Sequence, residues 1–229
     1  MYQNGGETPM NRNSRVFEIL GNRYFLPIKG NIIETKTKIL VESTLLFAQY
    51  GYAAVSVRDI ADAVEITPGA LYNHFDSKES LWVGILDQAE QLFTKYCDEL
   101  DANIEQADTF EDVIKLIFKK PREMKNIYAC YVFSIVCSEK LHDRHAMRIF
   151  TDVFWKRGAV LMQGWFDKAI AGGKVKKFDT GIASTAIMDM LLSAVVAWVQ
   201  NDINPANHSN YLSHVDAAEC FIRTVSGTE

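Results

Sequence analysis

Residues that break helices are scarce in this sequence, since only 5 of its 229 residues are proline and 13 are glycine. Sustained alternation of apolar and polar residues, the pattern of a half-buried β-strand, is also lacking. Apolar residues instead recur at intervals of three and four along nearly the whole chain, which is the spacing of a helix with one buried face. These features predict an all-α protein with no internal repeat and no low-complexity segment.

Cysteine is scarce as well, and the four thiols form no CxxC pair of the kind that binds zinc or exchanges disulfides. Cys130 and Cys137 would lie about 10 Å apart along one helix, which is too far for a disulfide. The N-terminal segment lacks the apolar stretch of a secretion signal, and the longest apolar runs, such as Ala194 to Val199, are shorter than a membrane span. We therefore expect a cytoplasmic protein with reduced thiols and no membrane partner.

The motifs of common enzyme classes are absent: the sequence has no Gly-rich phosphate loop, no GxSxG turn and no HExxH. His142 and His145 lie three residues apart and could share one face of a helix, but two ligands do not make a metal site. We therefore expect no enzyme, with no catalytic residue, no metal site and no cofactor. A small helical enzyme or metal-binding protein is the alternative from another functional class.

An excess of positive charge is missing too, because the formal net charge is −5. Any contact with nucleic acid must therefore come from a local surface. The first 30 residues, which contain four basic and two acidic side chains, are one such candidate. We expect residues 1–30 to form a flexible arm in which Arg15 to Leu20 could make a turn of helix. The arm is either a plain tail or a basic segment that lies against DNA.

Three helices are expected between residues 31 and 77. The first begins at Asn31 and is stopped by Gly51, the second begins at Ser56, and the third begins at Thr67. Serine, threonine and asparagine at these starts can accept hydrogen bonds from the first free N–H groups of a helix. The spacing predicts a compact three-helix domain.

The third of these helices has two different faces. Leu71 and Phe75 are four residues apart and point inward, while Gly69, Tyr72 and Asn73 fall on the opposite side. A short helix with such an exposed face, packed across a preceding helix, is a helix-turn-helix that can enter the major groove of DNA. The residues expected to contact DNA are Ser56, Arg58, Thr67, Pro68, Gly69, Ala70, Tyr72, Asn73, His74 and Lys78.

The stretch from Ala48 to Trp82 resembles the TetR family of bacterial transcriptional regulators. It reads AQYGYAAVSVRDIADAVEITPGALYNHFDSKESLW. The resemblance implies a homodimer that places its third helices in adjacent major grooves of a palindromic operator in double-stranded DNA. It also implies a larger C-terminal domain that binds a small molecule, shifts the fourth helix and releases the operator. A repressor is the expected function, and an activator of the same architecture is the alternative.

Two features depart from the pattern of the family. Glu65 stands in the turn where the family usually has glycine, and a left-handed backbone there would cost about 1 kcal/mol. Residues 32–80 also carry four basic against seven acidic side chains, so that the domain should bind DNA weakly except as a dimer on a good site. Arg58 and Lys78 are the expected phosphate partners.

Residues 78–229 are expected to form a helical domain for ligand binding and dimerisation. A fourth helix, capped by Asp76 and Glu79, runs to about Leu100, and a long helix from about Asp179 to Gln200 is apolar on nearly all sides. Because such a helix must be covered on several sides, it should join the last helix in an interface with a second copy of the chain.

The same domain is expected to hold a cavity for a hydrophobic or aromatic effector. Aromatic and methionine side chains recur along its helices and could line such a cavity, although they could equally be ordinary core. The candidate lining residues are Tyr128, Tyr131, Phe154, Met162, Trp165 and Met188.

Overall fold

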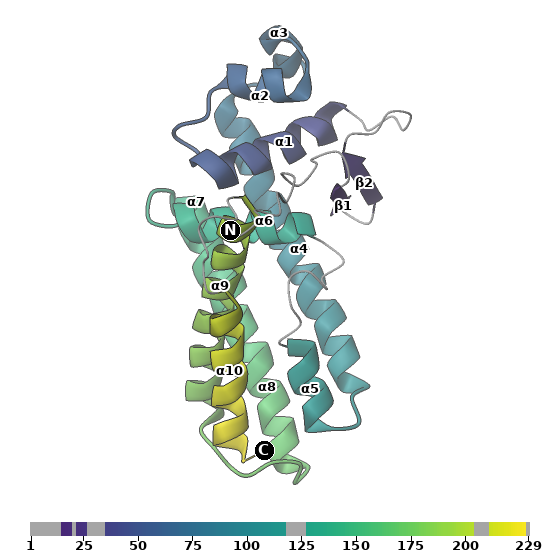
Figure 1. The fold of residues 1–229 in the computed structure, drawn as a ribbon, viewed down its shortest axis with the longest axis vertical. Helices are drawn as coiled ribbons and strands as arrows, with labels where there is room; N and C mark the ends of the chain where they lie inside the picture. The colour runs from purple at the N-terminus through teal and green to yellow at the C-terminus, as the bar shows by residue number, and fades with distance from the viewer. Residues whose placement is uncertain (1–14, 20–21, 27–34, 118–126, 204–210, 228–229) are drawn as a thin grey trace, which may run out of the picture.

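The computed structural model describes residues 15–19, 22–26, 35–117, 127–203 and 211–227 of the chain. These residues form an elongated molecule with a small helical head at one end and a larger helical body below it (Figure 1). The described part is helical except for one hairpin, so that the predicted all-α fold is confirmed. The expected cap at Asn31 lies outside the described residues, and the first described helix starts at Thr35.

The head consists of three helices, whose bounds are α1 (Thr35–Tyr50), α2 (Val57–Val64) and α3 (Pro68–Tyr72). Ile39, Phe47, Ile60 and Leu71 are buried where these helices meet. The chain leaves α1 through Gly51, whose φ of 82° is the left-handed conformation that glycine adopts without strain. The three helices and their order agree with the prediction from the sequence.

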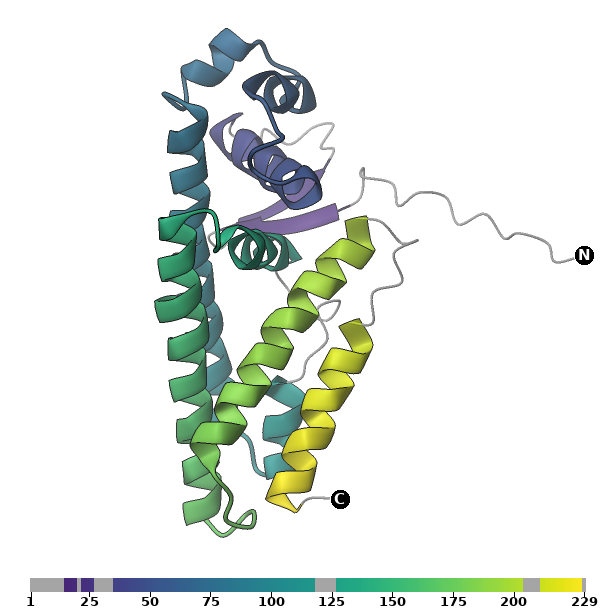
Figure 2. The same ribbon diagram turned by 90° about the vertical axis from the view of Figure 1, so that its left-hand side faces the viewer.

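A single long helix, α4 (Lys78–Glu105), connects the head to the far end of the body (Figure 2). Its N-cap is Ser77, which exchanges backbone and side-chain hydrogen bonds with Ser80. The predicted cap formed by Asp76 and Glu79 is therefore wrong by one residue, because two serines make the reciprocal pair. The helix also runs five residues beyond Leu100, and its 28 residues span about 42 Å at 1.5 Å per residue.

The described part of the body contains seven further helical segments. α6 crosses beneath the head, while α8, α9 and α10 run side by side along the length of the body (Figures 1 and 2). The residues from Arg144 to Ala171 form one continuous helical stretch, whose middle part, η3, is a π-helix. The bounds are α5 (Phe110–Ile117), α6 (Ile127–Glu139), α7 (Arg144–Arg148), η3 (Ile149–Arg157), α8 (Gly158–Ala171), α9 (Thr180–Ile203) and α10 (Tyr211–Ser226).

The N-terminal segment contains a hairpin of two antiparallel strands, β1 (Arg15–Ile19) and β2 (Asn22–Leu26). Arg15 pairs with Leu26, and β1 lies against α6. The predicted turn of helix is therefore wrong for Arg15–Ile19. The physical reason is that both segments are rich in β-branched and aromatic residues, which favour strands, and only two residues separate them.

One described helix is long and apolar enough to cross a membrane, by length and composition alone. It is the part of α9 from Thr180 to Gln200, with a mean hydropathy of 1.9. α9 packs against α6, α8 and α10, and 44% of its most apolar window is buried. A core helix of this kind accounts for the composition without a membrane.

Candidate nucleic-acid interface and ligand pocket

The short helix α3 is held at its start by a side-chain cap. The Thr67 hydroxyl accepts a hydrogen bond from the Ala70 N–H at 3.1 Å, and Pro68 occupies the first helical position, where no N–H is needed. Leu71 is 0% exposed and Phe75 is 8% exposed, so that one face of the segment is anchored in the core of the head.

The opposite face of α3 points to solvent. Tyr72 is 50% exposed, and Gly69, Asn73 and His74 are exposed as well. A side chain at Gly69 would meet nothing closer than the Thr67 hydroxyl at 3.9 Å, so the packing of the chain does not require glycine there. The lack of a side chain instead leaves room for an approaching molecule. α3 stands at the tip of the molecule, farthest from the body (Figure 1).

The turn before α3 keeps the geometry of a glycine turn although it has a glutamate. Glu65 has φ 63° and ψ 42°, in the left-handed region, and its N–H donates to the carbonyl of Asp62. Among the described residues, no other non-glycine residue has a positive φ. The turn therefore keeps its shape, at a backbone cost of about 1 kcal/mol.

The start of α2 is fixed by a reciprocal cap. The Ser56 hydroxyl accepts from the Asp59 N–H at 3.2 Å, and the Asp59 carboxylate accepts from the Ser56 N–H at 2.7 Å. The Ser56 hydroxyl also donates to the Asp59 carboxylate at 2.7 Å, and this bond, followed by that from the Ser56 N–H, holds the pKa of Asp59 below its ordinary value. Arg58 is exposed in the first turn of α2. Ser56 and Arg58 are therefore presented on the head together with the exposed face of α3.

Lys78 does not point away from the protein as the sequence suggested. Its ammonium donates to the Tyr52 carbonyl at 2.5 Å and lies 4.1 Å from the centre of the Tyr52 ring. Burial, and then the nearby Glu79 carboxylate, raises the pKa of the Tyr52 phenol. Lys38 is held similarly, since its ammonium donates to the Val64 carbonyl at 2.7 Å. Two of the four basic side chains of the head thus stabilise the head itself.

A buried polar cluster joins the head to the body. The Tyr128 hydroxyl of α6 lies 3.0 Å from the Thr44 hydroxyl of α1 and donates to the Gln88 side-chain oxygen of α4 at 2.9 Å. Burial raises the pKa of Tyr128, so the phenol is neutral at physiological pH. Tyr128 was a predicted ligand residue, but its hydroxyl is engaged in holding three helices together. Sequence reasoning missed this, because Thr44 lies 84 residues earlier in the chain.

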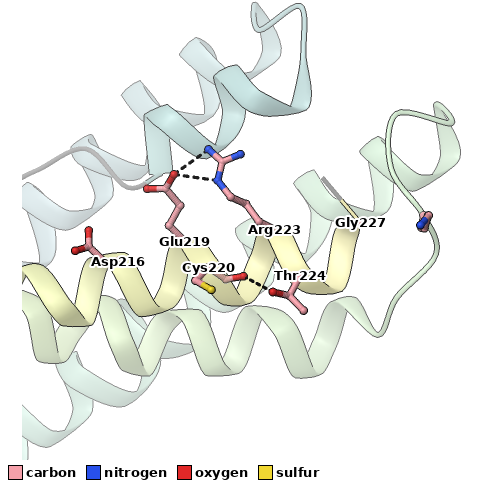
Figure 3. A pocket seen from close by; sticks show the side chains of 7 residues that line it. Asp216, Glu219, Cys220, Arg223, Thr224 and Gly227 are labelled. Atoms are coloured by element: carbon pink, nitrogen blue, oxygen red, sulfur yellow. Dashed lines mark hydrogen bonds and ion pairs between the residues drawn. The ribbon is translucent and has the colours of Figure 1, made fainter. Parts of the chain in front are cut away.

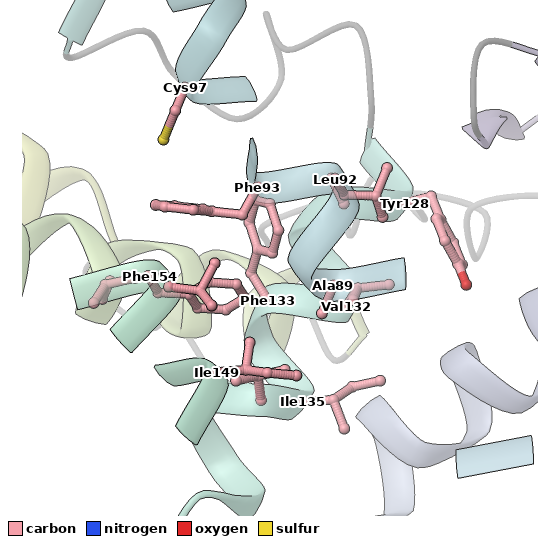
Figure 4. Close-up of a cluster of buried hydrophobic side chains, with 14 of the residues drawn as sticks. Ala89, Leu92, Phe93, Cys97, Tyr128, Val132, Phe133, Ile135, Ile149 and Phe154 are labelled. Carbon is pink, nitrogen blue, oxygen red and sulfur yellow. The ribbon is translucent and has the colours of Figure 1, made fainter. Parts of the chain in front are cut away.

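The other predicted ligand residues lie in the core of the body. Phe154 packs between Phe93 and Phe133, with ring centres 4.8 Å and 4.9 Å apart (Figure 4). All six predicted ligand residues, Tyr128 included, are buried. They do not jointly line either of the two cavities described below. The six predicted residues are Tyr128, Tyr131, Phe154, Met162, Trp165 and Met188, of which Trp165 lines one of these cavities.

One cavity, which we call the α10 crevice, is about 610 Å³ in volume and is lined mainly by residues with charged or polar side chains. The Arg223 guanidinium donates to the carboxylates of Glu219 and Glu111, and the contact with Glu219 is visible in Figure 3. The hydrogen bond from Arg223 holds the pKa of Glu111 below its ordinary value. The charge of the guanidinium is thus already compensated. The lining residues are Lys176, Asp216, Glu219, Cys220, Arg223, Thr224 and Gly227.

A second cavity, which we call the α4–α5–α8 cavity, has a volume of about 420 Å³ and a largely apolar wall. The Trp165 indole N–H donates to the Asp101 carboxylate at 2.6 Å, so that Trp165 offers ring surface and no free donor. Two lysines and one glutamate complete the lining. The residues are Ile104, Glu105, Ala107, Phe110, Val113, Trp165, Lys168, Ala169 and Lys174.

The four cysteines form no disulfide bond, as the sequence predicted. Burial raises the pKa of Cys97 and of Cys137 to about 12, which keeps both protonated and unreactive near neutral pH.

Comparison with known proteins gives a consistent result. The sequence profile described as bacterial regulatory proteins, tetR family, matches residues 39–83, from α1 to the first turns of α4. HTH-type transcriptional repressor KstR2 of Rhodococcus jostii (strain RHA1) is 41% identical over 80 residues, which are 34% of this chain and 39% of the relative. The sequence likeness therefore spans less than half of that curated relative.

Solved structures extend the likeness in fold to most of the chain. Reduced NemR of Escherichia coli superposes with a TM-score of 0.60 at 14% identity, covering 84% of this chain and 97% of that one. A protein from Saccharomonospora viridis in complex with choline gives a TM-score of 0.61 at 15% identity, covering 82% and 95%. At these identities the likeness concerns the fold alone.

Proposed function

We infer that the chain is a DNA-binding transcriptional regulator of the TetR family. Its N-terminal domain matches the profile of that family of bacterial regulatory proteins. The observation that carries this inference is the two-sided α3, with Leu71 buried and Tyr72 and Asn73 exposed at the tip of the molecule. No packing within the described chain explains that exposed face. Entry into a major groove does explain it.

Residues 31–77 act as the DNA-binding domain in this proposal, and residues 78–229 bind the effector and the second subunit. In this proposal Asn73 and Tyr72 read base edges, while Arg58 and His74 contact the DNA backbone. We assign Lys78 a positioning role within the head instead of a DNA contact, because its ammonium donates a hydrogen bond to the Tyr52 carbonyl. The remaining proposed DNA contacts come from Ser56, Thr67, Pro68, Gly69 and Ala70.

A homodimer formed through α9 and α10 completes the proposal. Ile182 is 66% exposed although it is a large apolar residue, and Val195 and Val196 of α9 are only partly covered. A second copy packed on this face would cover them. Two heads related by twofold symmetry would meet successive major grooves of a palindromic operator, about 34 Å apart.

We propose that the chain is a repressor whose operator is released by a small hydrophobic or aromatic effector. α4 supports this, because one end is fixed to the head through Lys78 and Tyr52 and the other end reaches the α4–α5–α8 cavity. A ligand that binds one position of α4 better than another would shift the spacing of the two heads. Operator DNA lies in the cytoplasm of a bacterium, so the proposed location is cytoplasmic, with no membrane partner.

The test is a gel shift with the promoter region of the chain's own gene. We expect a shift that weakens with salt, and about tenfold weaker binding for Tyr72→Ala and for Asn73→Ala. Tyr50→Ala removes another exposed tyrosine of the head and should bind like the unmodified chain. The absence of any shift at low salt with neighbouring promoters would overturn the proposed function.

A further inference from the structure

We propose that the α4–α5–α8 cavity binds an amphipathic organic anion, with an apolar body and a single carboxylate, and that this molecule is the effector. The claim that this molecule is the effector rests on the proposed function. The cavity lies at the end of α4 that is remote from the head, between α5 and the second half of α8.

The wall of the cavity suits the apolar body of such a ligand. Phe110, Val113 and Trp165 are nearly buried yet line the cavity, and Ile104 and Ala169 add aliphatic surface. Because Asp101 already accepts the indole N–H, Trp165 requires no polar group from a ligand. A volume of about 420 Å³ lies within the range of small-molecule pockets.

The rim of the cavity supplies the charge preference. Lys168 and Lys174 contribute two ammonium groups, and Glu105 is the one carboxylate among the lining residues. Lys168 lies 3.7 Å from Glu105, and Lys174 donates to a backbone carbonyl, that of Asp108. The ion pair of Lys168 is thus longer than a hydrogen bond, and the hydrogen bond of Lys174 is to a neutral carbonyl. A ligand carboxylate at the rim would form charge-assisted hydrogen bonds with both.

The α10 crevice provides the contrast that favours this site. Its central cation, Arg223, is already bonded to two carboxylates, Glu111 and Glu219, so that a further anion would gain little there. The crevice is also lined mainly by polar side chains. The α4–α5–α8 cavity instead sets aromatic and aliphatic side chains beside two lysines, of which Lys168 lies 3.7 Å from Glu105 and Lys174 donates to a backbone carbonyl.

Occupation of the cavity would act directly on α4. Ile104 and Glu105 belong to the last turn of α4, and the ion pair between Glu105 and Lys168 is an attachment of that turn to α8. A ligand carboxylate that binds Lys168 competes with Glu105 for the ammonium. The distal end of α4 would then be released from α8, while its other end remains fixed to the head.

The experiment is calorimetric titration of the full chain with decanoate and with 2-naphthoate, two carboxylates that differ in the shape of the apolar body. Decanamide is the neutral comparison for decanoate. We expect at least one carboxylate to bind about tenfold more tightly than decanamide, and Lys168→Gln/Lys174→Gln to remove that advantage while leaving the affinity for decanamide unchanged. Lys156→Gln, an exposed lysine of η3, is the matched control.

Equal affinity for carboxylate and amide, undiminished carboxylate binding by the double variant, or no binding of either carboxylate would overturn the proposal. Ala169→Phe, which fills the cavity, should abolish binding of both carboxylates and supplies a second test. A gel shift on the same preparations tests the proposed DNA binding separately from the proposed ligand binding. If operator DNA binds but no carboxylate does, this inference alone fails. If carboxylates bind as expected but no DNA does, the pocket stands and the proposed regulator does not.

Discussion

The helices α2 and α3 of the head are short and start at side-chain caps, whereas most of the body consists of longer helices held by burial. Ser56 and Thr67 begin α2 and α3 with side-chain hydrogen bonds, while α8 starts without one. Every residue from Tyr128 to Val136 in α6 is buried. The head is therefore specified by signals within a few residues, and the body by contacts between distant segments. Substitutions should act on the two regions in correspondingly different ways.

The largest effect is expected in the core of the body. Phe154→Ala removes the ring between Phe93 and Phe133 and should lower the free energy of unfolding by about 3–5 kcal/mol. Urea denaturation followed by circular dichroism, at one fixed protein concentration, measures this. Val160→Ala, at an exposed position of α8, should change it by less than about 0.5 kcal/mol. A loss below about 1 kcal/mol for Phe154→Ala would mean that the body tolerates cavities. It would contradict the view that burial, more than local signals, holds the body together.

An intermediate effect is expected where the two regions join. Tyr128→Phe deprives Gln88 of a hydrogen-bond donor and Thr44 of one partner, so the free energy of unfolding should fall by about 1–2 kcal/mol. If head and body unfolded in separate thermal transitions in this variant, the Tyr128 cluster would be what couples the unfolding of the two regions. Tyr50→Phe removes an exposed hydroxyl of the head and serves as the control. Unchanged stability of Tyr128→Phe would show that the buried cluster does not join the regions energetically.

A smaller, pH-dependent effect is expected between α5 and α10. The pKa of Glu111 is lowered by Arg223, so the pair stabilises the fold above the ordinary pKa of glutamate and loses this contribution as the pH falls through the lowered value. Arg223→Met should cost about 1 kcal/mol at neutral pH, and the difference from the unmodified chain should shrink below about pH 4. Denaturation at a series of pH values tests this. A difference that grows on acidification would contradict the assignment, and Lys177→Met is the control.

The smallest effect is expected at the turn of the head. Glu65→Gly relieves the left-handed strain and should raise the free energy of unfolding by up to about 1 kcal/mol. Glu65→Gln removes the same charge but keeps the strain, so its stability should not change. If both variants gained equally, charge rather than backbone conformation would be the cause. Thermal denaturation of the three proteins decides between these causes.

The parts that sequence reasoning predicted well are those with local signals. Thr67 and Pro68 mark the start of α3, and the spacing of Leu71 and Phe75 identifies its buried side. The capping pair of α4 was misplaced by one residue, because several polar residues in that segment are compatible with a cap. Local patterns thus give the elements of the head and nearly their ends.

The parts that were missed depend on contacts between distant residues. Nothing near Lys78 indicates that its ammonium would meet the Tyr52 carbonyl, and nothing near Tyr128 indicates Thr44 as a partner. The hairpin was missed because five-residue segments rich in aromatic residues fit a helical turn as well as a strand. The lining of the α4–α5–α8 cavity comes from three separate helices, and only Trp165 was among the residues predicted for a pocket.

The inward direction of Lys38 and Lys78 has a consequence for how the head responds to its ionic surroundings. Proteins that grip DNA through many ammonium groups displace as many condensed counterions, and their affinity falls steeply when the intracellular potassium concentration rises. Because these two ammonium groups hold the carbonyls of Val64 and Tyr52, they displace none. Under the proposed function, promoter occupancy by this chain should therefore fall less steeply during an osmotic shock than that of more basic regulators.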